Sequence, residues 1–220
     1  MAQRLLKFAI FGNEYQIKKA IPIQKVLSYL SEKQAEVYMD RMFYDFLTQE
    51  QRLEMEIAGV FDGMDFQADC AISMGGDGTF LKAASRVGAK QIPIIGVNMG
   101  RMGFLADVLP SEIESALNSI YLGEYKIENH TVIQVEANGE PITGYPYALN
   151  DIAVLKRDIA SMITIRTHID GELLVAYQAD GLIIATPPII SPTAAPSSCL
   201  KTTVFASHPS HPIASIFAPS

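Results

Sequence analysis

A short glycine-rich segment carries the side chains best suited to chemistry in this sequence. Residues 73–79 read Ser-Met-Gly-Gly-Asp-Gly-Thr, between an apolar run and a helical pattern. Glycines let backbone amides approach an anion closely, and the N-terminus of the following helix favours negative charge. Asp77 adds a carboxylate that could bind Mg²⁺ or accept a hydroxyl proton, as phosphoryl transfer requires. The residues predicted to contact phosphate are Gly75, Gly76, Gly78 and Thr79.

A second glycine cluster follows at residues 96–105, with the sequence Gly-Val-Asn-Met-Gly-Arg-Met-Gly-Phe-Leu. It also follows a strand pattern, so it could line the same crevice, although a tight crossover would account for it equally well. An Asp-Gly pair alone is most often a simple turn, but the two preceding glycines, Thr79 and the strand-to-helix context favour a functional interpretation of the first cluster. Neither cluster matches the dinucleotide fingerprint or the P-loop.

The elements around these clusters alternate between strand and helix patterns. Buried strands are predicted at 7–11, 35–39, 70–74 and 92–97. Helices are predicted around 23–30, over 41–54, and from 111 to a stop at Gly123. Strands that are separated by helices form parallel sheets. We therefore expect a doubly wound α/β domain over residues 1–125.

The hydrophobic period changes from helical to two after Tyr125, which indicates strands that are buried on one side. Asn138-Gly139 and Asp170-Gly171 are typical hairpin turns. Residues 126–187 are therefore predicted to form a second, β-rich domain.

Composition restricts the class of protein. The 220 residues carry 17 basic and 24 acidic side chains, a net charge of −7, which disfavours nucleic acid as a partner. No apolar run approaches the roughly 20 residues of a membrane helix, and the N-terminus lacks a secretory pattern. Cys70 and Cys199 are too few for a disulfide framework, and the pair His208 and His211 has no acidic or thiolate neighbour, so no metal site is predicted. These features favour a soluble protein of the reducing cytoplasm.

The two glycine clusters, followed by Ala-Leu-Asn-Asp at 148–151, resemble the motifs of NAD kinases, which phosphorylate the adenosine 2′-hydroxyl of NAD. The resemblance covers roughly residues 5–187. It implies that Asp77 is the catalytic base and contacts NAD together with Gly78. It also implies that Asn150 and Asp151 bind the dinucleotide, with Asp151 in place of the commoner glutamate.

The segment Gln-Ala-Asp-Gly at 178–181 resembles the strand that leads into the family's next motif. By this resemblance Asp180 would help to hold NAD, with Gln178 beside it. In isolation, Asn150-Asp151 is most often a turn or capping pair and Asp180-Gly181 a hairpin corner. The family further implies ATP as the phosphoryl donor, Mg²⁺ or another divalent cation as cofactor, and a homo-oligomer without nucleic-acid or membrane partners.

The chain departs from the family after Thr186-Pro187, where a Thr-Gly-Ser-Thr-Ala-Tyr loop is expected. Residues 187–220 instead hold seven of the 12 prolines, seven serines and one charge, Lys201. This composition predicts a disordered, aberrant tail over 188–220. Translation of the tail in one constant shifted frame, with TCN serine codons, permits two later family segments in order. We therefore hypothesise a frameshift near codon 187, which would leave strand edges of the second domain unpaired and the chain inactive.

Three functions follow from these patterns. The first is an NAD kinase, and the second is a non-catalytic dinucleotide-binding remnant, which the altered tail favours. The third is a lipid kinase of the diacylglycerol or sphingosine type, which shares the Gly-Gly-Asp-Gly-Thr pattern. Asn150-Asp151 and the second glycine cluster argue against the lipid kinase.

Overall fold

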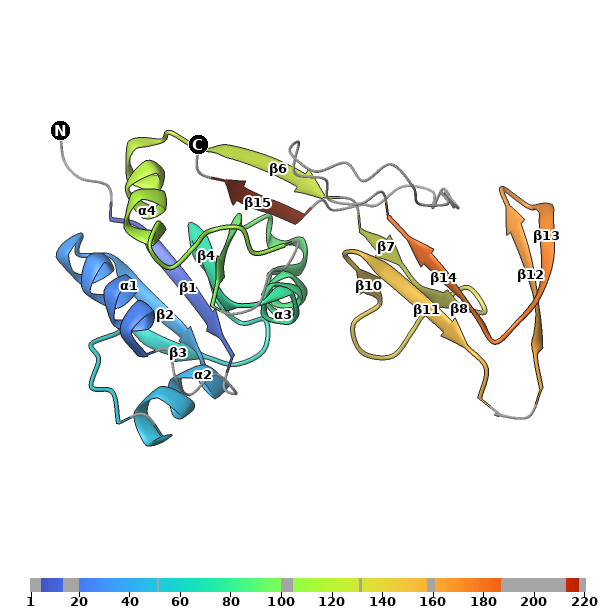
Figure 1. The fold of residues 1–220 in the computed structure, drawn as a ribbon, viewed down its shortest axis with the longest axis horizontal. Coiled ribbons are helices and arrows are strands. Elements are labelled where there is room, and N and C mark those ends of the chain that lie inside the picture. Colours follow the sequence, from blue (N-terminus) through green and yellow to red (C-terminus); the bar gives the residue numbers. More distant parts are fainter. Residues whose placement is uncertain are drawn as a thin grey trace. The chain divides into compact units, whose positions relative to one another are not determined.

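The chain folds into two compact units, which are described separately. The computed structural model describes residues 5–13, 20–50, 52–99, 105–130, 132–157, 161–186 and 213–217. Unit 1 comprises residues 1–130 and 211–220, and unit 2 comprises residues 131–210 (Figure 1). Among the described residues, no helix has both the length and the apolar character that a bilayer span requires.

Unit 1 is built on a seven-stranded sheet of order β3-β2-β1-β4-β5-β15-β6. Its parallel part consists of β1 (Lys7–Gly12), β2 (Glu36–Asp40), β3 (Gly59–Phe61), β4 (Cys70–Gly75) and β5 (Ile94–Asn98). Four of these strands confirm the predicted ones, and the three-residue β3 was not predicted. The α/β fold class is thereby confirmed.

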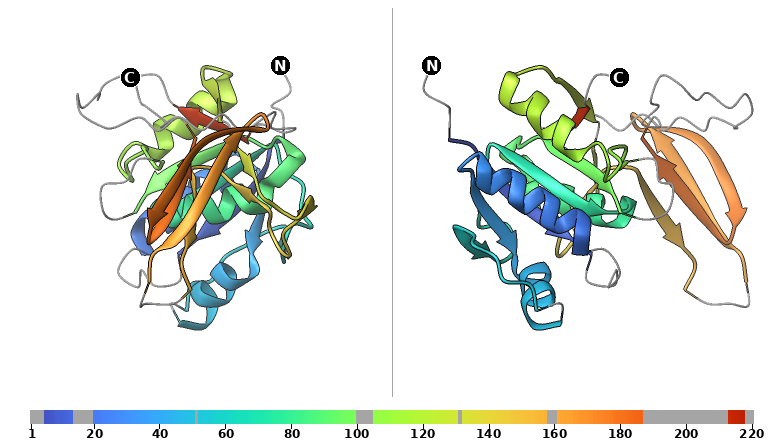
Figure 2. Two further views of the ribbon diagram at one scale, coloured as in Figure 1. Left: turned by 90° about the vertical axis from the view of Figure 1, so that its right-hand side faces the viewer. Right: turned by 60° about the vertical axis from the view of Figure 1, so that its left-hand side comes forward.

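Helices cover both faces of this sheet (Figure 2). β1 is followed by α1 (Ala20–Glu32) and then by β2 on one side of it, whereas β4 is followed by α3 (Asp77–Val87) and then by β5 on the other side. Right-handed crossovers in opposite directions place α1 and α3 on opposite faces. The direction reverses between β1 and β4, so their carboxyl ends form the topological switch point at which open α/β sheets bind ligands.

The two faces have separate cores. On the α1 face, α4 (Ile113–Leu122) lies beside α1, and the apolar cluster includes Phe8, Ile10, Leu30, Ile72 and Leu117. On the other face, the ring of Phe11 lies 5.3 Å from that of Phe61 between centroids, and the buried Phe80 of α3 approaches Gly96.

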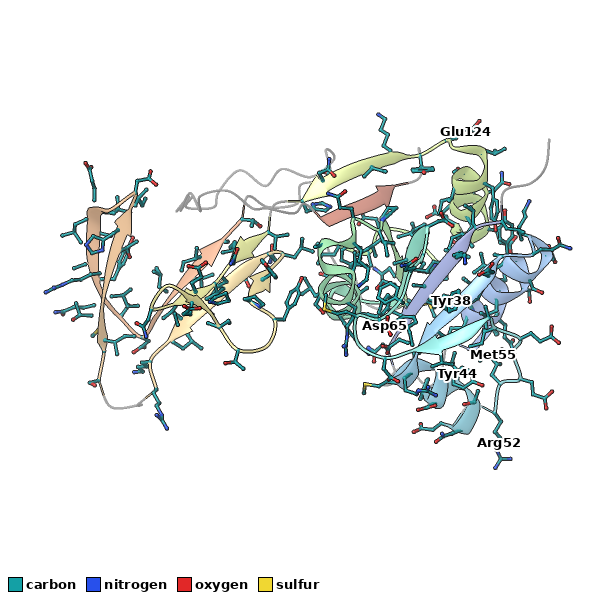
Figure 3. The ribbon with its side chains drawn as sticks, turned by 180° about the vertical axis from the view of Figure 1, so that it is seen from behind. Tyr38, Tyr44, Arg52, Met55, Asp65 and Glu124 are labelled. Carbon is teal, nitrogen blue, oxygen red and sulfur yellow. The ribbon has the colours of Figure 1, made fainter. Side chains whose placement is uncertain are left out.

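The helix predicted over residues 41–54 is shorter in the structure. It consists of α2 (Arg41–Asp45) and a π-helical turn, η1 (Phe46–Glu50). The Thr48 hydroxyl donates to the Tyr44 carbonyl at 2.9 Å within it. Arg52, which points away from the sheet, has a left-handed backbone with φ 51° (Figure 3). A left-handed residue cannot continue a right-handed helix, so the helical pattern of the sequence is interrupted there.

The outer strands of unit 1 come from distant parts of the chain. β15 (Ile213–Phe217) pairs antiparallel with β6 (Lys126–His130) and parallel with β5 through Ser215 and Ile94. Unit 1 therefore extends to His130, beyond the predicted boundary at 125. Part of the segment that was predicted to be disordered is a strand, because its pairing satisfies backbone groups of β6. The other residues of 188–220 lie outside the described residues.

Unit 2 consists of two-stranded antiparallel ribbons in the described residues. The two longer ribbons join β11 (Asp151–Leu155) to β14 (Gly181–Ala185) and β12 (Ile163–Ile169) to β13 (Glu172–Ala179). The shorter ribbons join β7 (Ile133–Gln134) to β10 (Tyr147–Ala148) and β8 (Glu136–Ala137) to β9 (Glu140–Pro141). Positive φ angles at 138, 139, 170 and 171 agree with the two predicted hairpin turns. The β-rich character of this region is therefore confirmed.

Candidate functional site

The first glycine cluster lies at the carboxyl end of β4 and opens α3. Gly75 ends the strand, Gly76 is the N-cap with φ −104° and ψ −165°, and Asp77 is the first helical residue. The amide of Thr79 donates to the Gly76 carbonyl at 3.0 Å, which closes the first turn. The amides of a helix's first turn point outward from its N-terminus, where they favour an anion. The structure thus places the predicted phosphate loop at the switch point.

The glycines of this cluster differ in what the fold demands of them. A Cβ atom at Gly75 would overlap the hydroxyl oxygen of Thr79 and lie 2.5 Å from its Cβ. At Gly76 and Gly78 a Cβ atom would meet nothing within 4 Å, and neither residue has a positive φ. Packing therefore requires glycine only at 75. The other two glycines leave the loop backbone open to close approach by a ligand.

The side chain of Asp77 connects the two glycine clusters. Its Oδ1 atom accepts a hydrogen bond of 3.0 Å from the amide of Leu105, at the end of the second cluster. Residues 100–104 of that cluster lie outside the described residues. The amide of Met99, within the same cluster, donates to the Gly75 carbonyl at 2.9 Å. The structure therefore brings the two clusters together at the carboxyl ends of β4 and β5.

The chain that follows the second cluster lies along β5. The amide of Val108 donates to the Gly96 carbonyl at 3.0 Å, and the amide of Asn98 donates to the Val108 carbonyl at 2.8 Å. A Cβ atom at Gly96 would lie 2.8 Å from the Cα atom of Ala106. Glycine at 96 is therefore what allows this segment to approach β5 and present the Leu105 amide to Asp77.

A second carboxylate accompanies Asp77, which sequence reasoning did not single out. Partial burial, followed by the negative charges of Asp77 and Glu128, raises the pKa of the Asp107 carboxyl above its ordinary value. Carboxylates that repel one another in this way favour a proton or a cation nearby. No group of three or more His, Cys, Asp or Glu side chains in the described part of the chain could hold a metal ion by itself. Asp107 could be found only from the fold, because no local motif marks it.

Asn150 and Asp151 lie in unit 2, where β11 begins. Asp151 pairs with Ala185 of β14. Thr186, which follows Ala185, holds the backbone of residues 149–150. The Thr186 hydroxyl lies 3.1 Å from the carbonyl oxygens of Leu149 and Asn150, and its amide donates to Asn150 at 2.9 Å. The side chains of Asn150 and Asp151 are exposed. Thr186 therefore fixes the backbone that presents them.

Asp180 lies at the other end of the same ribbon. Its carboxylate forms an ion pair of 2.6 Å with Lys156, and the following Gly181 pairs with Leu155. At about 3.3 Å per residue, roughly 15 Å of ribbon separates Asp151 from Asp180. Gln178 lies on β13, opposite Thr164. Within unit 2, the predicted NAD contacts therefore occupy two separate positions.

Comparison with known proteins agrees with these motifs. Residues 8–125 match the model of the ATP-NAD kinase N-terminal domain. NAD kinase of Bacteroides fragilis is 50% identical over 182 residues, which are 83% of this chain and 63% of that protein. NAD kinase of Porphyromonas gingivalis is 40% identical over 182 residues, 82% of this chain and 62% of that protein. The chain thus spans less than two thirds of the length of these relatives.

Two solved structures share the fold. The crystal structure of yeast NADH kinase complexed with NADH has a TM-score of 0.69 at 19% identity, over 82% of this chain and 57% of that one. The NAD kinase from Archaeoglobus fulgidus in complex with ATP has a TM-score of 0.57 at 24% identity, over 82% and 60%. These identities support the fold alone, whereas the domain match covers more than half of the chain and both glycine clusters. The chain belongs to the NAD kinase family.

Proposed function

We propose that this protein transfers the γ-phosphate of ATP to the adenosine 2′-hydroxyl of NAD, giving NADP and ADP. The observation that carries the proposal is Asp77, held by the Leu105 amide at the N-terminus of α3, in an open glycine loop at the switch point. Relatives named NAD kinase support it, as does the fold shared with kinases solved with ATP and with NADH.

In this reaction Asp77 accepts the 2′-hydroxyl proton while the hydroxyl oxygen forms a bond to the γ-phosphorus. The bond between that phosphorus and the β,γ-bridging oxygen breaks, and ADP leaves with the electron pair. The Leu105 amide at 3.0 Å orients the carboxylate. Gly75, Gly76, Gly78 and Thr79 bind phosphate through the loop and the positive end of the helix dipole.

NAD is bound by the remaining predicted residues. By the family resemblance these are Asp77, Gly78, Asn150, Asp151, Gln178 and Asp180. Mg²⁺ or another divalent cation, when bound, neutralises phosphate charge and needs only one or two protein carboxylates. Asp107, near Asp77, is a carboxylate of unit 1 that would suit it. We also propose that the protein is cytoplasmic and that it forms a homo-oligomer. Light scattering would test the oligomeric state.

A second candidate is a dinucleotide-binding protein without catalysis. The tail composition after Thr186 favours it, because the family's Thr-Gly-Ser-Thr-Ala-Tyr loop does not occur in the sequence. Sequencing of the gene on both strands tests the proposed frameshift, and an intact frame with AGY serine codons would refute it.

The deciding experiment measures NADP formation by the purified 220-residue chain with NAD, ATP and Mg²⁺. Asp77→Asn is the matched variant, since the amide oxygen of asparagine can still accept from Leu105. Turnover that this substitution abolishes supports the kinase. Protection of the fold by NAD against heat, without turnover, supports the binding protein. Folded protein that shows neither refutes both.

A further inference from the structure

An ion pair beside the glycine loop has no part in the roles assigned so far. The Lys82 Nζ atom of α3 lies 2.8 Å from an Asp40 Oδ2 atom at the end of β2. The Asp40 side chain is only 4% exposed and that of Lys82 is 29% exposed. Burying a carboxylate lowers the free energy of unfolding unless the charge is paired. The question is therefore why the fold keeps a carboxylate at this buried position.

In the strand register, Asp40 stands between two phenylalanines on the α3 face of the sheet. It pairs with Phe61 of β3, and since Met39 pairs with Ile10, its neighbour on the other side is Phe11. Asp40 stands at the N-cap of α2 but makes no side-chain capping bond there. Helix capping therefore does not account for a carboxylate at position 40. The ion pair with Lys82 of α3 accounts for it.

Lys82 fixes α3 in a way that the helix's apolar contacts cannot. The buried side chains of α3 besides Thr79 are Phe80, Ala83, Ala84 and Val87. Apolar contacts carry no direction of their own, whereas an ion pair joins two defined atoms. The ion pair connects α3, which packs over β4 and β1, to the more distant β2. It thus sets the orientation of the helix whose first turn is the phosphate loop.

We propose that Asp40 and Lys82 are positioning residues that aim the loop of Gly75 to Thr79 at its phosphate ligand. The proposal rests on the proposed function for the identity of that ligand, the ATP phosphates. Lys82 acts through Asp40 and not by touching the nucleotide. Both members of the pair are then needed for tight binding, whereas a lysine that contacted phosphate directly would bind at least as well without its acidic partner.

The test compares Asp40→Asn, Lys82→Met, Lys82→Arg and the double variant Asp40→Leu/Lys82→Met with the parent chain. ATP affinity is measured by calorimetry, stability by urea unfolding, and local order by hydrogen exchange of amides 77–80. An apolar pair of similar volume can replace a buried ion pair without loss of stability. We therefore expect the double variant to unfold like the parent.

The double variant should nevertheless bind ATP about tenfold more weakly and exchange amides 77–80 several-fold faster. Asp40→Asn should weaken ATP binding as well, and Lys82→Arg should retain most of the affinity. Parent-like exchange and affinity in the double variant would overturn the proposal, as would tighter binding by Asp40→Asn. If the parent itself does not bind ATP, the proposed function fails, and the exchange rates still decide whether the pair orders the loop.

Discussion

Gly75→Ala is predicted to destabilise unit 1 although it adds only one methyl group. The new Cβ atom would overlap the Thr79 hydroxyl and lie 2.5 Å from Thr79 Cβ. Both residues are buried, and Thr79 belongs to the first turn of α3, so neither side chain nor backbone can move away cheaply. Overpacking of this kind costs about 1–3 kcal/mol, and we expect the upper part of that range, about 3 kcal/mol.

Gly78→Ala is the matched control in the same loop. Its Cβ atom would meet nothing within 4 Å, and residue 78 is helical. Alanine in a helix is more favourable than glycine by up to about 1 kcal/mol, so a gain of about 0.5 kcal/mol is expected near the helix end. The same alanine, three positions apart, should therefore change stability in opposite directions.

Urea unfolding followed by circular dichroism at 222 nm measures both variants, because the described α-helices lie in unit 1. With a slope of about 2–3 kcal/mol/M, the Gly75→Ala midpoint should fall by roughly 1 M. The Gly78→Ala midpoint should stay the same or rise slightly. Equal midpoints for the two variants, or a larger loss for Gly78→Ala, would refute the packing argument.

Three further predictions concern buried groups. Burial raises the pKa of the Cys70 thiol to about 12, so in a Cys199→Ser background a thiol reagent at pH 8 should react only after unfolding. The unfolded Cys70 thiol ionises from about pH 9 while the folded one keeps its proton, so the free energy of unfolding should fall between pH 9 and 12. Cys70→Ala should remove this fall. An identical pH profile of stability with and without Cys70→Ala would contradict the prediction. Thr186→Val should cost about 1–2 kcal/mol in urea unfolding, because the backbone at Leu149 and Asn150 loses the single hydroxyl donor that lies 3.1 Å from both carbonyl oxygens. An unchanged midpoint would exclude that role.

The parts of the fold that the sequence predicted are those whose signals are local. β1 and β4 are continuous apolar runs buried on both faces, and such runs identify central parallel strands. The Asn138 and Asp170 turns were predictable because few residues besides glycine adopt their left-handed backbone. The end of the helix after residue 50 was missed, because the positive φ of Arg52 leaves no mark in the hydrophobic pattern.

The candidate site divides in the same way. Asp77 and its glycines could be predicted, since strand, loop and helix follow one another directly in the chain. The contact of Asp77 with the Leu105 amide and the pairing of Asp40 with Lys82 join residues from different elements. Their partners are set by strand order and helix packing, which no local spacing encodes. Thr186 was missed as an anchor for the same reason.

The pairing of β6 with β15 also constrains when unit 1 can be completed during synthesis. His130 lies opposite Ile213, so the sheet cannot close until all of residues 131–212 have been made. At about 5–20 residues per second, the ribosome needs on the order of 4–16 s for that stretch. Throughout this interval β6 has no strand on either side, and one edge of β5 stays largely open. That edge therefore stays open to pairing with other chains for several seconds after the glycine loop of residues 75–79 has been synthesised.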